Sequence, residues 1–176
     1  MIETLISSKT RIKLLIKFFL NSNTSSYLRG LEGEFGESTN SIRIELNRLE
    51  KAGMLISEMD GNKKRYRANV DHPLFPDVHS IVMKYTGLSG LAEYITRQIG
   101  EVKAVYLTGD FAEGLESEVI DLVLVGHLNR AFLAELVERA EKVTGKKIRY
   151  LLYHPDEFTL ENIHRDHHSS LELWKE

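Results

Sequence analysis

Two amphipathic stretches separated by only Gly36 and Glu37 are the feature that most constrains how this chain folds. The first stretch begins at Ser26, a residue type that caps helices, and its inward positions are Tyr27, Leu28, Leu31 and Phe35. Gly36 is expected to end this helix, because glycine adopts the left-handed conformation that closes helices. Two helices joined by so short a connection predict a helix-turn-helix.

The second stretch predicts a helix over residues 38–52. Ser38 or Thr39 is expected to open it, and Gly53, directly after Ala52, is expected to stop it. Its apolar positions share one face and predict burial of Ile42, Leu46 and Leu49.

A helix over residues 8–20 is expected to pack against this pair, because Ile12, Leu15, Ile16 and Phe19 follow helical spacing. Leu14 and Phe18 form a second apolar pair outside that stripe, so the helix is more apolar than one core contact requires. Two explanations stay open. Either a second subunit covers the excess, or a second domain or linker helix covers it within one chain.

A β-hairpin is expected next, with strands over 54–59 and 63–70 around an Asp60-Gly61-Asn62 turn. In the second strand the inward residues Tyr66, Ala68 and Val70 alternate with Arg65, Arg67 and Asn69. The basic side chains Lys63, Lys64, Arg65 and Arg67 therefore gather at the tip and return strand of the hairpin.

Charge is distributed unevenly along the chain, although the net charge is only -3. Residues 1–70 hold 12 Lys and Arg against 8 Asp and Glu, whereas residues 71–176 hold 11 against 18. A polyanion, if one binds, is expected to bind the basic N-terminal part. The alternative is solvated charge without a partner.

The polar face of the 38–52 helix carries residue types that suit DNA. Asn40, Arg43 and Asn47 lie opposite its apolar face, and Arg and Asn side chains can form paired hydrogen bonds with guanine and adenine edges. The helix start offers phosphate contacts from Ser38, Thr39 and Ser41. The hairpin cations Lys63, Lys64, Arg65 and Arg67 are expected to add affinity that depends on salt and not on sequence.

Residues 5–70 resemble the winged helix domains of ArsR- and MarR-type transcriptional regulators, through STNSIRIELNRLEKAGML at 38–55 followed by the basic hairpin. The resemblance implies a homodimer that recognises a palindromic or repeated site in double-stranded DNA, with Arg43 and Asn47 in the base-contacting positions. A winged helix that serves protein contacts alone is the alternative.

The chain changes character after residue 70. His72-Pro73 marks a boundary, and helices over 76–85 and around Leu91, Ile95 and Ile99 predict a helical connector at 71–100. From residue 102 the pattern is strand (102–107), loop (108–116), strand (119–125), helix (130–143) and strand (147–153), which predicts an α/β domain at 101–176. The part after residue 153 is expected to be a short helix with a loose tail.

Residues 102–125 resemble the nucleotidyltransferase fold of small antitoxin-like and antibiotic-modifying proteins, through LTGDFAEGLESEVIDLVLV at 107–125. The family's motif is degenerate here: Gly109 and Asp121 match it, but Asp110 replaces a serine and Val119 replaces a metal-binding acid. Glu118 would point to the other face of the strand. The strand at 147–153 also lacks the third acid, so the resemblance implies a domain without catalytic activity.

Other kinds of site find little support in the sequence. The chain has no cysteine, so disulfides and thiolate metal sites are excluded. It has no long apolar segment and no signal peptide, so a cytoplasmic protein without membrane contact is expected. The cluster of His164, Asp166, His167 and His168 is expected to be a polar tail, because adjacent ligands seldom close a metal site. No cofactor, metal or catalytic residue is predicted.

Together these features predict an α+β protein with a winged helix-turn-helix at 1–70, a connector at 71–100 and a nucleotidyltransferase-like domain at 101–176. The predicted function is a dimeric, sequence-specific transcriptional regulator that is not an enzyme. Its second domain would serve dimerisation, sensing of a small-molecule or protein effector, or partner binding. Two alternatives are a DNA-tethered nucleotidyltransferase and an antitoxin-like protein-interaction module.

Overall fold

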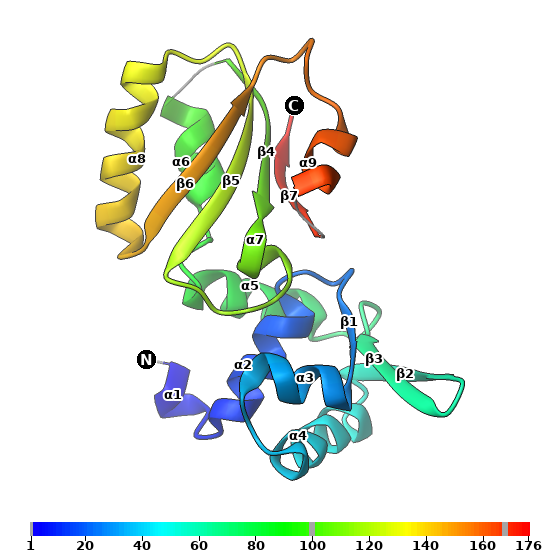
Figure 1. Cartoon of the computed structure of the whole chain (residues 1–176). Helices are drawn as coiled ribbons and strands as arrows, with labels where there is room; N and C mark the ends of the chain where they lie inside the picture. The colour runs from blue at the N-terminus through cyan, green and yellow to red at the C-terminus, as the bar shows by residue number, and fades with distance from the viewer. Residues whose placement is uncertain (1, 99–100, 167–168) are drawn as a thin grey trace. The chain divides into compact units, whose positions relative to one another are not determined.

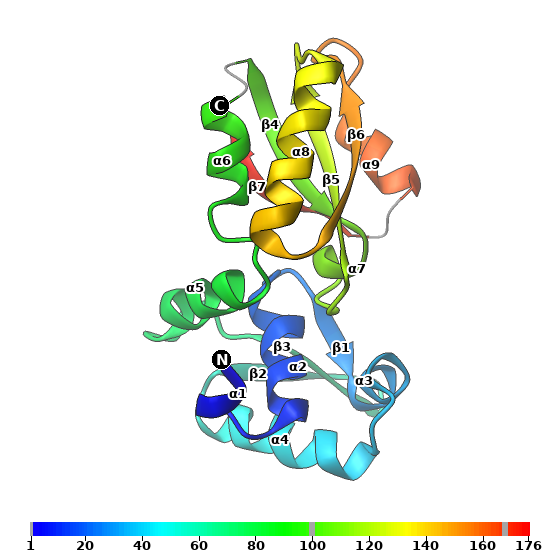
Figure 2. The ribbon, with the colours of Figure 1, turned by 90° about the vertical axis from the view of Figure 1, so that its left-hand side faces the viewer.

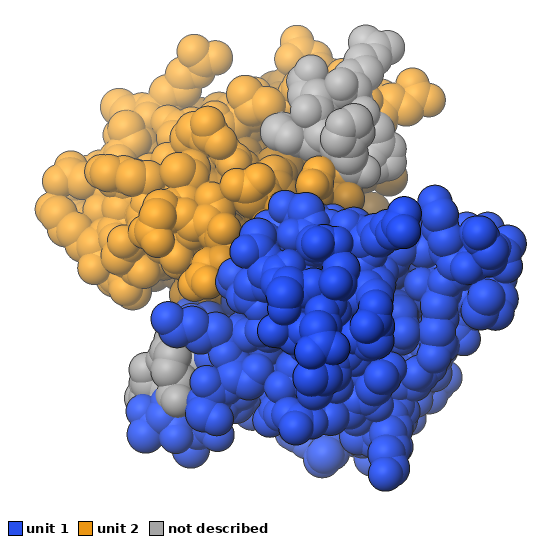
Figure 3. Space-filling model, turned by 60° about the horizontal axis from the view of Figure 1, so that its bottom comes forward, with its two compact units in different colours: residues 1–85 blue, residues 86–176 orange. Residues whose placement is uncertain are grey.

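The computed structural model describes residues 2–98, 101–166 and 169–176, and within them the chain is mixed α+β with two β-sheets. The chain divides into two compact units, Met1–Tyr85 and Thr86–Glu176 (Figure 3). The stretch predicted as a connector is shared between them, since its first helix falls in unit 1 and its second in unit 2. Among the described helices, none is both long and apolar enough to span a membrane.

Unit 1 places helices against a small antiparallel sheet with strand order β1-β3-β2 (Figure 1). Ser38 caps α4 and Gly36 ends α3 in the left-handed conformation, as the sequence predicts. The elements in chain order are α1 (Ile2–Leu5), α2 (Lys9–Phe19), β1 (Ser25–Tyr27), α3 (Leu28–Phe35), α4 (Thr39–Lys51), β2 (Leu55–Asp60), β3 (Lys63–Ala68) and α5 (Phe75–Tyr85).

The first helix of the predicted helix-turn-helix starts later than expected. Ser26 does not cap it, because residues 25–27 form β1 and Ser26 lies opposite Tyr66 of β3. α3 therefore begins at Leu28, without a side-chain cap. Hydrogen bonding to a strand forty residues away overrides the local capping preference. The return strand of the hairpin also ends early, at Ala68, which leaves Val70 exposed.

Helix α2 is buried on nearly all sides, including Leu14 and Phe18, which the sequence left without an assigned partner. It contacts α4, β3 and α5 within unit 1. The contact with α5 includes the rings of Phe19 and Phe75, with centroids 5.6 Å apart, and His79 Nδ1 lies 2.6 Å from the Phe19 carbonyl oxygen. Leu14 and Phe18 are fully buried within a single chain, which favours the second of the two explanations.

Unit 2 contains a four-stranded sheet with order β6-β5-β4-β7. β4 runs antiparallel to β5 and β7, and β5 runs parallel to β6 through the crossover helix α8. The elements are α6 (Leu91–Gln98), β4 (Val102–Thr108), α7 (Gly109–Ala112), β5 (Val119–Gly126), α8 (Arg130–Thr144), β6 (Lys147–Tyr153), α9 (Leu160–Asp166) and β7 (Leu171–Lys175).

The two central strands of this sheet are buried on both faces. Figure 2 shows α6 and α8 over one face and α9 over the other. On the α9 side, Ile163 packs with Tyr106 and Val123, flanked by Phe158. Alternation directs Val105, Leu107, Leu122 and Leu124 to the opposite face, and all four are buried.

The end of the chain is more ordered than the sequence predicts. Residues 171–175, expected as a loose tail, form strand β7 and pair with β4. The Lys103 and Glu176 side chains form an ion pair across this edge. Strand β7 has only five residues, and it forms by pairing with the edge of β4.

Candidate functional site

The polar face of α4 is open to solvent. Ile42, Leu46 and Leu49 are buried, and Asn40, Arg43 and Asn47 lie exposed on the other side of the helix, as their spacing predicts. In the described part of the chain, these three side chains form no hydrogen bond or ion pair. They are therefore available to an external partner.

The start of α4 is closed by its own hydroxyl groups. The Ser38 hydroxyl accepts a hydrogen bond from the Ser41 backbone N–H at 3.2 Å, and the two hydroxyl oxygens lie 2.9 Å apart. Thr39 is half-buried. Ser38 and Ser41 are exposed and keep acceptor or donor capacity for a phosphate, but part of it already stabilises the helix end.

The four basic residues of the hairpin do not act as one group. Lys64 Nζ lies 2.7 Å from Glu50 Oε2, and Arg65 Nη2 lies 2.7 Å from Glu58 Oε1, so both cations are neutralised within unit 1. Hydrogen bonding to Lys64 and Ser57 lowers the pKa of Glu50, which keeps that pair charged. Lys63 and Arg67 are exposed and have no acidic partner among the described residues.

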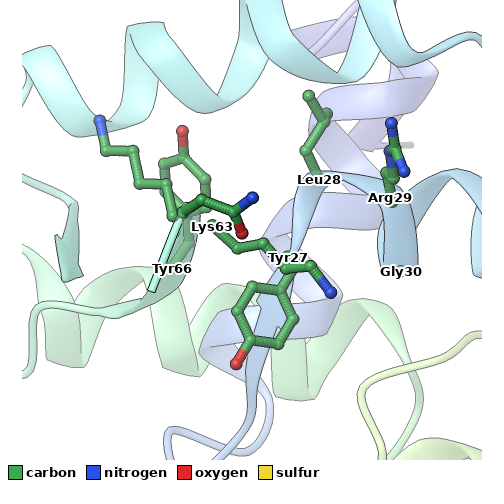
Figure 4. Close-up of a pocket in the computed structure, with 8 residues that line it drawn as sticks. Tyr27, Leu28, Arg29, Gly30, Lys63 and Tyr66 are labelled. Atoms are coloured by element: carbon green, nitrogen blue, oxygen red, sulfur yellow. The ribbon is translucent and has the colours of Figure 1, made fainter. Parts of the chain in front are cut away.

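A pocket of about 410 Å³ lies between the start of α3 and the turn of the hairpin (Figure 4). Arg29 borders it from α3, while Asn62 and Lys63 border it from the hairpin. Lys63 Nζ also lies 5.9 Å from the centroid of the Tyr27 ring. Tyr27, expected as an inward helix position, instead ends β1, and no sequence pattern marks Tyr27, Arg29 or Asn62 as binding residues, because only the pairing of β1 with β3 brings α3 beside the hairpin.

Basic residues elsewhere in unit 1 are mostly used internally. From α2, Lys13 pairs with Glu37 and Lys17 pairs with Glu34, each at 2.8 Å. These contacts fasten α2 to the helix-turn-helix and cancel charge on that side. The cations left without an acidic partner in the described part of α3, α4 and the hairpin are Arg29, Arg43, Lys51, Lys63 and Arg67.

A buried carboxylate holds α4 in position. Glu45 accepts hydrogen bonds from Arg11 Nε of α2 at 2.8 Å and from Arg48 Nη1 at 3.0 Å. Burial alone would raise the pKa of Glu45, but hydrogen bonds from Arg11 and Ser8 and the two positive charges outweigh it and hold the pKa below its ordinary value. Glu45 is thus charged at neutral pH and ties α4 to α2.

We expect Glu45→Gln to lower the free energy of unfolding by about 1–3 kcal/mol at pH 7, because charge-assisted hydrogen bonds are lost at a buried site. The folded-state pKa is lowered, so this stabilisation is complete above the ordinary value of about 4.3 and is lost as the pH falls through the folded-state pKa. Urea unfolding at pH 7 and pH 3 measures it. Glu32→Gln, at an exposed position on α3, is the control. If Glu45→Gln lowered the free energy of unfolding by the same amount at pH 7 and at pH 3, the expectation would be contradicted.

Unit 2 brings the residues of the degenerate nucleotidyltransferase motif together. Asp121 of β5 lies opposite Thr108 of β4, next to Gly109 at the start of α7. On its other side, Asp121 is in register with Arg149 of β6, whose Nε and Nη2 donate to its two carboxylate oxygens at 2.7 and 2.9 Å. Hydrogen bonding to Asp121 raises the pKa of Arg149, and the charge of Asp110 adds to this effect.

The Asp121 carboxylate is therefore already paired with a cation. It is largely buried, and a Cβ added to Gly109 would lie 2.5 Å from its Oδ2, so this position tolerates only glycine. No group of three or more His, Asp or Glu residues in the described part of the chain is arranged to hold a metal ion. The His164, Asp166, His167 and His168 side chains lie outside the described residues.

Comparison with known proteins gives distant matches only. No family model matches the chain, and neither does any curated protein. It is similar to a chain of a mutant MntA–HpeT toxin–antitoxin complex, with 13% identity over 50% of this chain and 71% of that one and a TM-score of 0.38. It is also similar to a chain of the tri-AMPylated Shewanella oneidensis HEPN toxin in complex with MNT antitoxin, with 12% identity over 53% and 73% and a TM-score of 0.38. Likeness at this level assigns no function to the chain.

Proposed function

We propose that unit 1 is a winged helix-turn-helix that binds double-stranded DNA and that the protein regulates transcription. The element order α2, β1, α3, α4, β2, β3, with the strand order β1-β3-β2, supports this fold. The observation that carries the function is the exposed, unpartnered polar face of α4, with Asn40, Arg43 and Asn47 one turn apart.

In this proposal α4 enters the major groove and the β2–β3 hairpin lies on the adjacent backbone. Arg43 and Asn47 would contact base edges, since their side chains match guanine and adenine. Lys63 and Arg67 would contact phosphates, and the pocket beside Arg29 would extend the phosphate contacts toward α3. Lys64 would act indirectly, because its ion pair with Glu50 holds the hairpin against α4. Arg65 would stabilise the hairpin itself, through its ion pair with Glu58 of β2.

The test is a fluorescence-anisotropy titration of labelled genomic duplex fragments with the full chain, at two salt concentrations and with unlabelled competitor DNA. Binding that resists the competitor and weakens with salt would support sequence-selective recognition. Absence of binding at low salt would refute the proposal.

Of the four hairpin cations, Lys63 and Arg67 are expected to contact phosphates, whereas Lys64 and Arg65 are held in ion pairs. We expect the double variant Lys63→Ala/Arg67→Ala to weaken binding to all duplexes and to lower the slope of log K against log salt by about 1.8, close to 0.9 for each lost phosphate contact. The affinity is measured at four or more salt concentrations. Lys142→Ala, at an exposed ion pair on α8, serves as the control; an unaltered slope in the double variant would remove the hairpin from the interface.

We also propose that unit 2 has a nucleotidyltransferase-like fold without catalytic activity and serves dimerisation, sensing or partner binding. The sequence β4, α7, β5, α8, β6, with Gly109 and Asp121 side by side, supports the fold. The bidentate contact of Arg149 with Asp121 supports inactivity, because the guanidinium lies where a metal ion would need a free carboxylate. Magnesium-dependent turnover of a nucleoside triphosphate that Asp121→Ala abolishes would overturn it.

An antitoxin-like interaction module is the second candidate. The acidic excess after residue 70 favours it, because an acidic unit can bind a basic protein surface. Co-purification of a stoichiometric protein partner, together with no salt-dependent affinity for DNA, would favour this function over the first.

A further inference from the structure

One apolar side chain of α4 lies outside its buried face. Ile42, Leu46 and Leu49 are buried. Ile44, by contrast, is 44% exposed. A helix turns by about 100° per residue, so Ile44 lies roughly 160° around α4 from both Ile42 and Leu46. It is therefore directed away from the core of unit 1 and lies near the centre of the exposed face of the helix.

The neighbours of Ile44 on this face carry base-matching side chains. Asn40 precedes it by four residues, and Asn47 follows it by three. Side chains at these spacings have Cβ atoms about 5–6 Å apart. Successive base pairs of a duplex are about 3.4 Å apart. A group in contact with Ile44 would therefore lie within about two base pairs of the group that Asn40 or Asn47 contacts.

The chemistry of the major groove limits what Ile44 could contact there. The base edges present hydrogen-bonding groups, and the C5-methyl group of thymine is the apolar group among them. Asn40 and Asn47 match adenine, and every A·T pair that presents an adenine edge also presents this methyl group. A lone apolar side chain among polar neighbours suits one methyl group better than the wider apolar centre of a protein interface.

We propose that Ile44 is a specificity-determining residue that packs against the C5-methyl group of a thymine. The inference rests on the proposed binding of α4 in the major groove, and it deepens that function because it names part of the recognised sequence. The preferred site would contain an A·T pair within about two base pairs of the contacts made by Asn40 or Asn47. Hydrogen bonds and an apolar contact from one helix face would together select the site.

Uracil tests this assignment, because deoxyuridine lacks only the C5-methyl group of thymidine and keeps every hydrogen-bonding group of the base. The preferred duplex from the genomic titration is compared with copies in which single thymines are replaced by uracil. Competition anisotropy with the full chain gives the affinities. Replacement of the contacted thymine is expected to weaken wild-type binding about fourfold, the equivalent of one buried methyl group.

Three variants complete the experiment. Ile44→Ala is expected to weaken binding to the thymine duplex about five- to tenfold and to bind the thymine and uracil copies equally well. Circular dichroism should report unchanged folding, since alanine favours helices and the position is exposed. Ile44→Val keeps a branched apolar side chain and is expected to remain sensitive to uracil. Ile81→Ala, at a 50% exposed position on α5, is the matched control and should bind both duplexes as the wild type does.

The wild type and Ile44→Ala with the two duplexes form a double-mutant cycle, in which any effect of uracil on the duplex itself cancels. Failure of the wild type to bind any duplex selectively would overturn the proposed function and this assignment together. Selective binding that uracil weakens at no position, or weakens equally for the wild type and Ile44→Ala, would overturn the assignment alone. Ile44 would then be left to a protein contact, and the DNA-binding function would stand.

Discussion

Arg43→Ala is expected to weaken binding to the preferred duplex by about 5- to 150-fold and to leave binding to competitor DNA nearly unchanged. The range corresponds to the roughly 1–3 kcal/mol that a bidentate contact with a base contributes to discrimination. Arg43 suits this contact because it is exposed at the middle of the α4 polar face and has no ion-pair partner among the described residues. Competition anisotropy at fixed salt gives both affinities.

The matched control is Arg139→Ala, which removes the same charge from an exposed ion pair with Glu135 on α8. This variant should bind both duplexes as the wild type does. An equal loss on preferred and competitor DNA after Arg43→Ala would assign Arg43 to a phosphate, and the base-contacting role would pass to another residue of the α4 face.

Leu46→Ala is expected to lower the free energy of unfolding by about 2–5 kcal/mol. Leu46 is fully buried, and truncation of a buried leucine removes apolar contacts and leaves a cavity that the surroundings fill only in part. The residue lies on the inward face of α4, so its loss also loosens the helix that carries Asn40, Arg43 and Asn47. Urea unfolding followed by circular dichroism measures the change.

Leu151→Ala provides the comparison for this substitution, because it removes the same atoms from an exposed position on β6. A change within about 0.5 kcal/mol is expected there. If Leu46→Ala lowered the free energy of unfolding no more than Leu151→Ala does, α4 would not be anchored through its apolar face. The assignment of its opposite face to solvent would then be wrong.

Local sequence patterns predicted most elements of the fold closely. α4 begins after Ser38 and β6 spans the predicted residues 147–153, because a capping serine and a short segment rich in apolar and aromatic residues specify these elements locally. The exposure of Asn40, Arg43 and Asn47 followed in the same way from helical periodicity. Their contact with DNA stays a prediction.

These local patterns could not predict the pairing of strands and charges that lie far apart in the sequence. β1 and β7 are strands of three and five residues, and each pairs with an edge of β3 or β4 that lies far from it in the sequence. The pocket beside Arg29 depends on β1 for the same reason. Ion pairing also had to await the structure, since Glu50 lies 14 residues from Lys64 in the sequence.

The sequence by itself determined where the helices and central strands lie and which faces they bury, because spacing and capping act within a few residues. Only the tertiary structure decided which charges are free. It paired Lys64 with Glu50 and Asp121 with Arg149, and it left Lys63 and Arg67 open. The physical reason is that an ion pair depends on distances of a few ångströms between segments far apart in the chain, and these distances exist only after the sheets have formed.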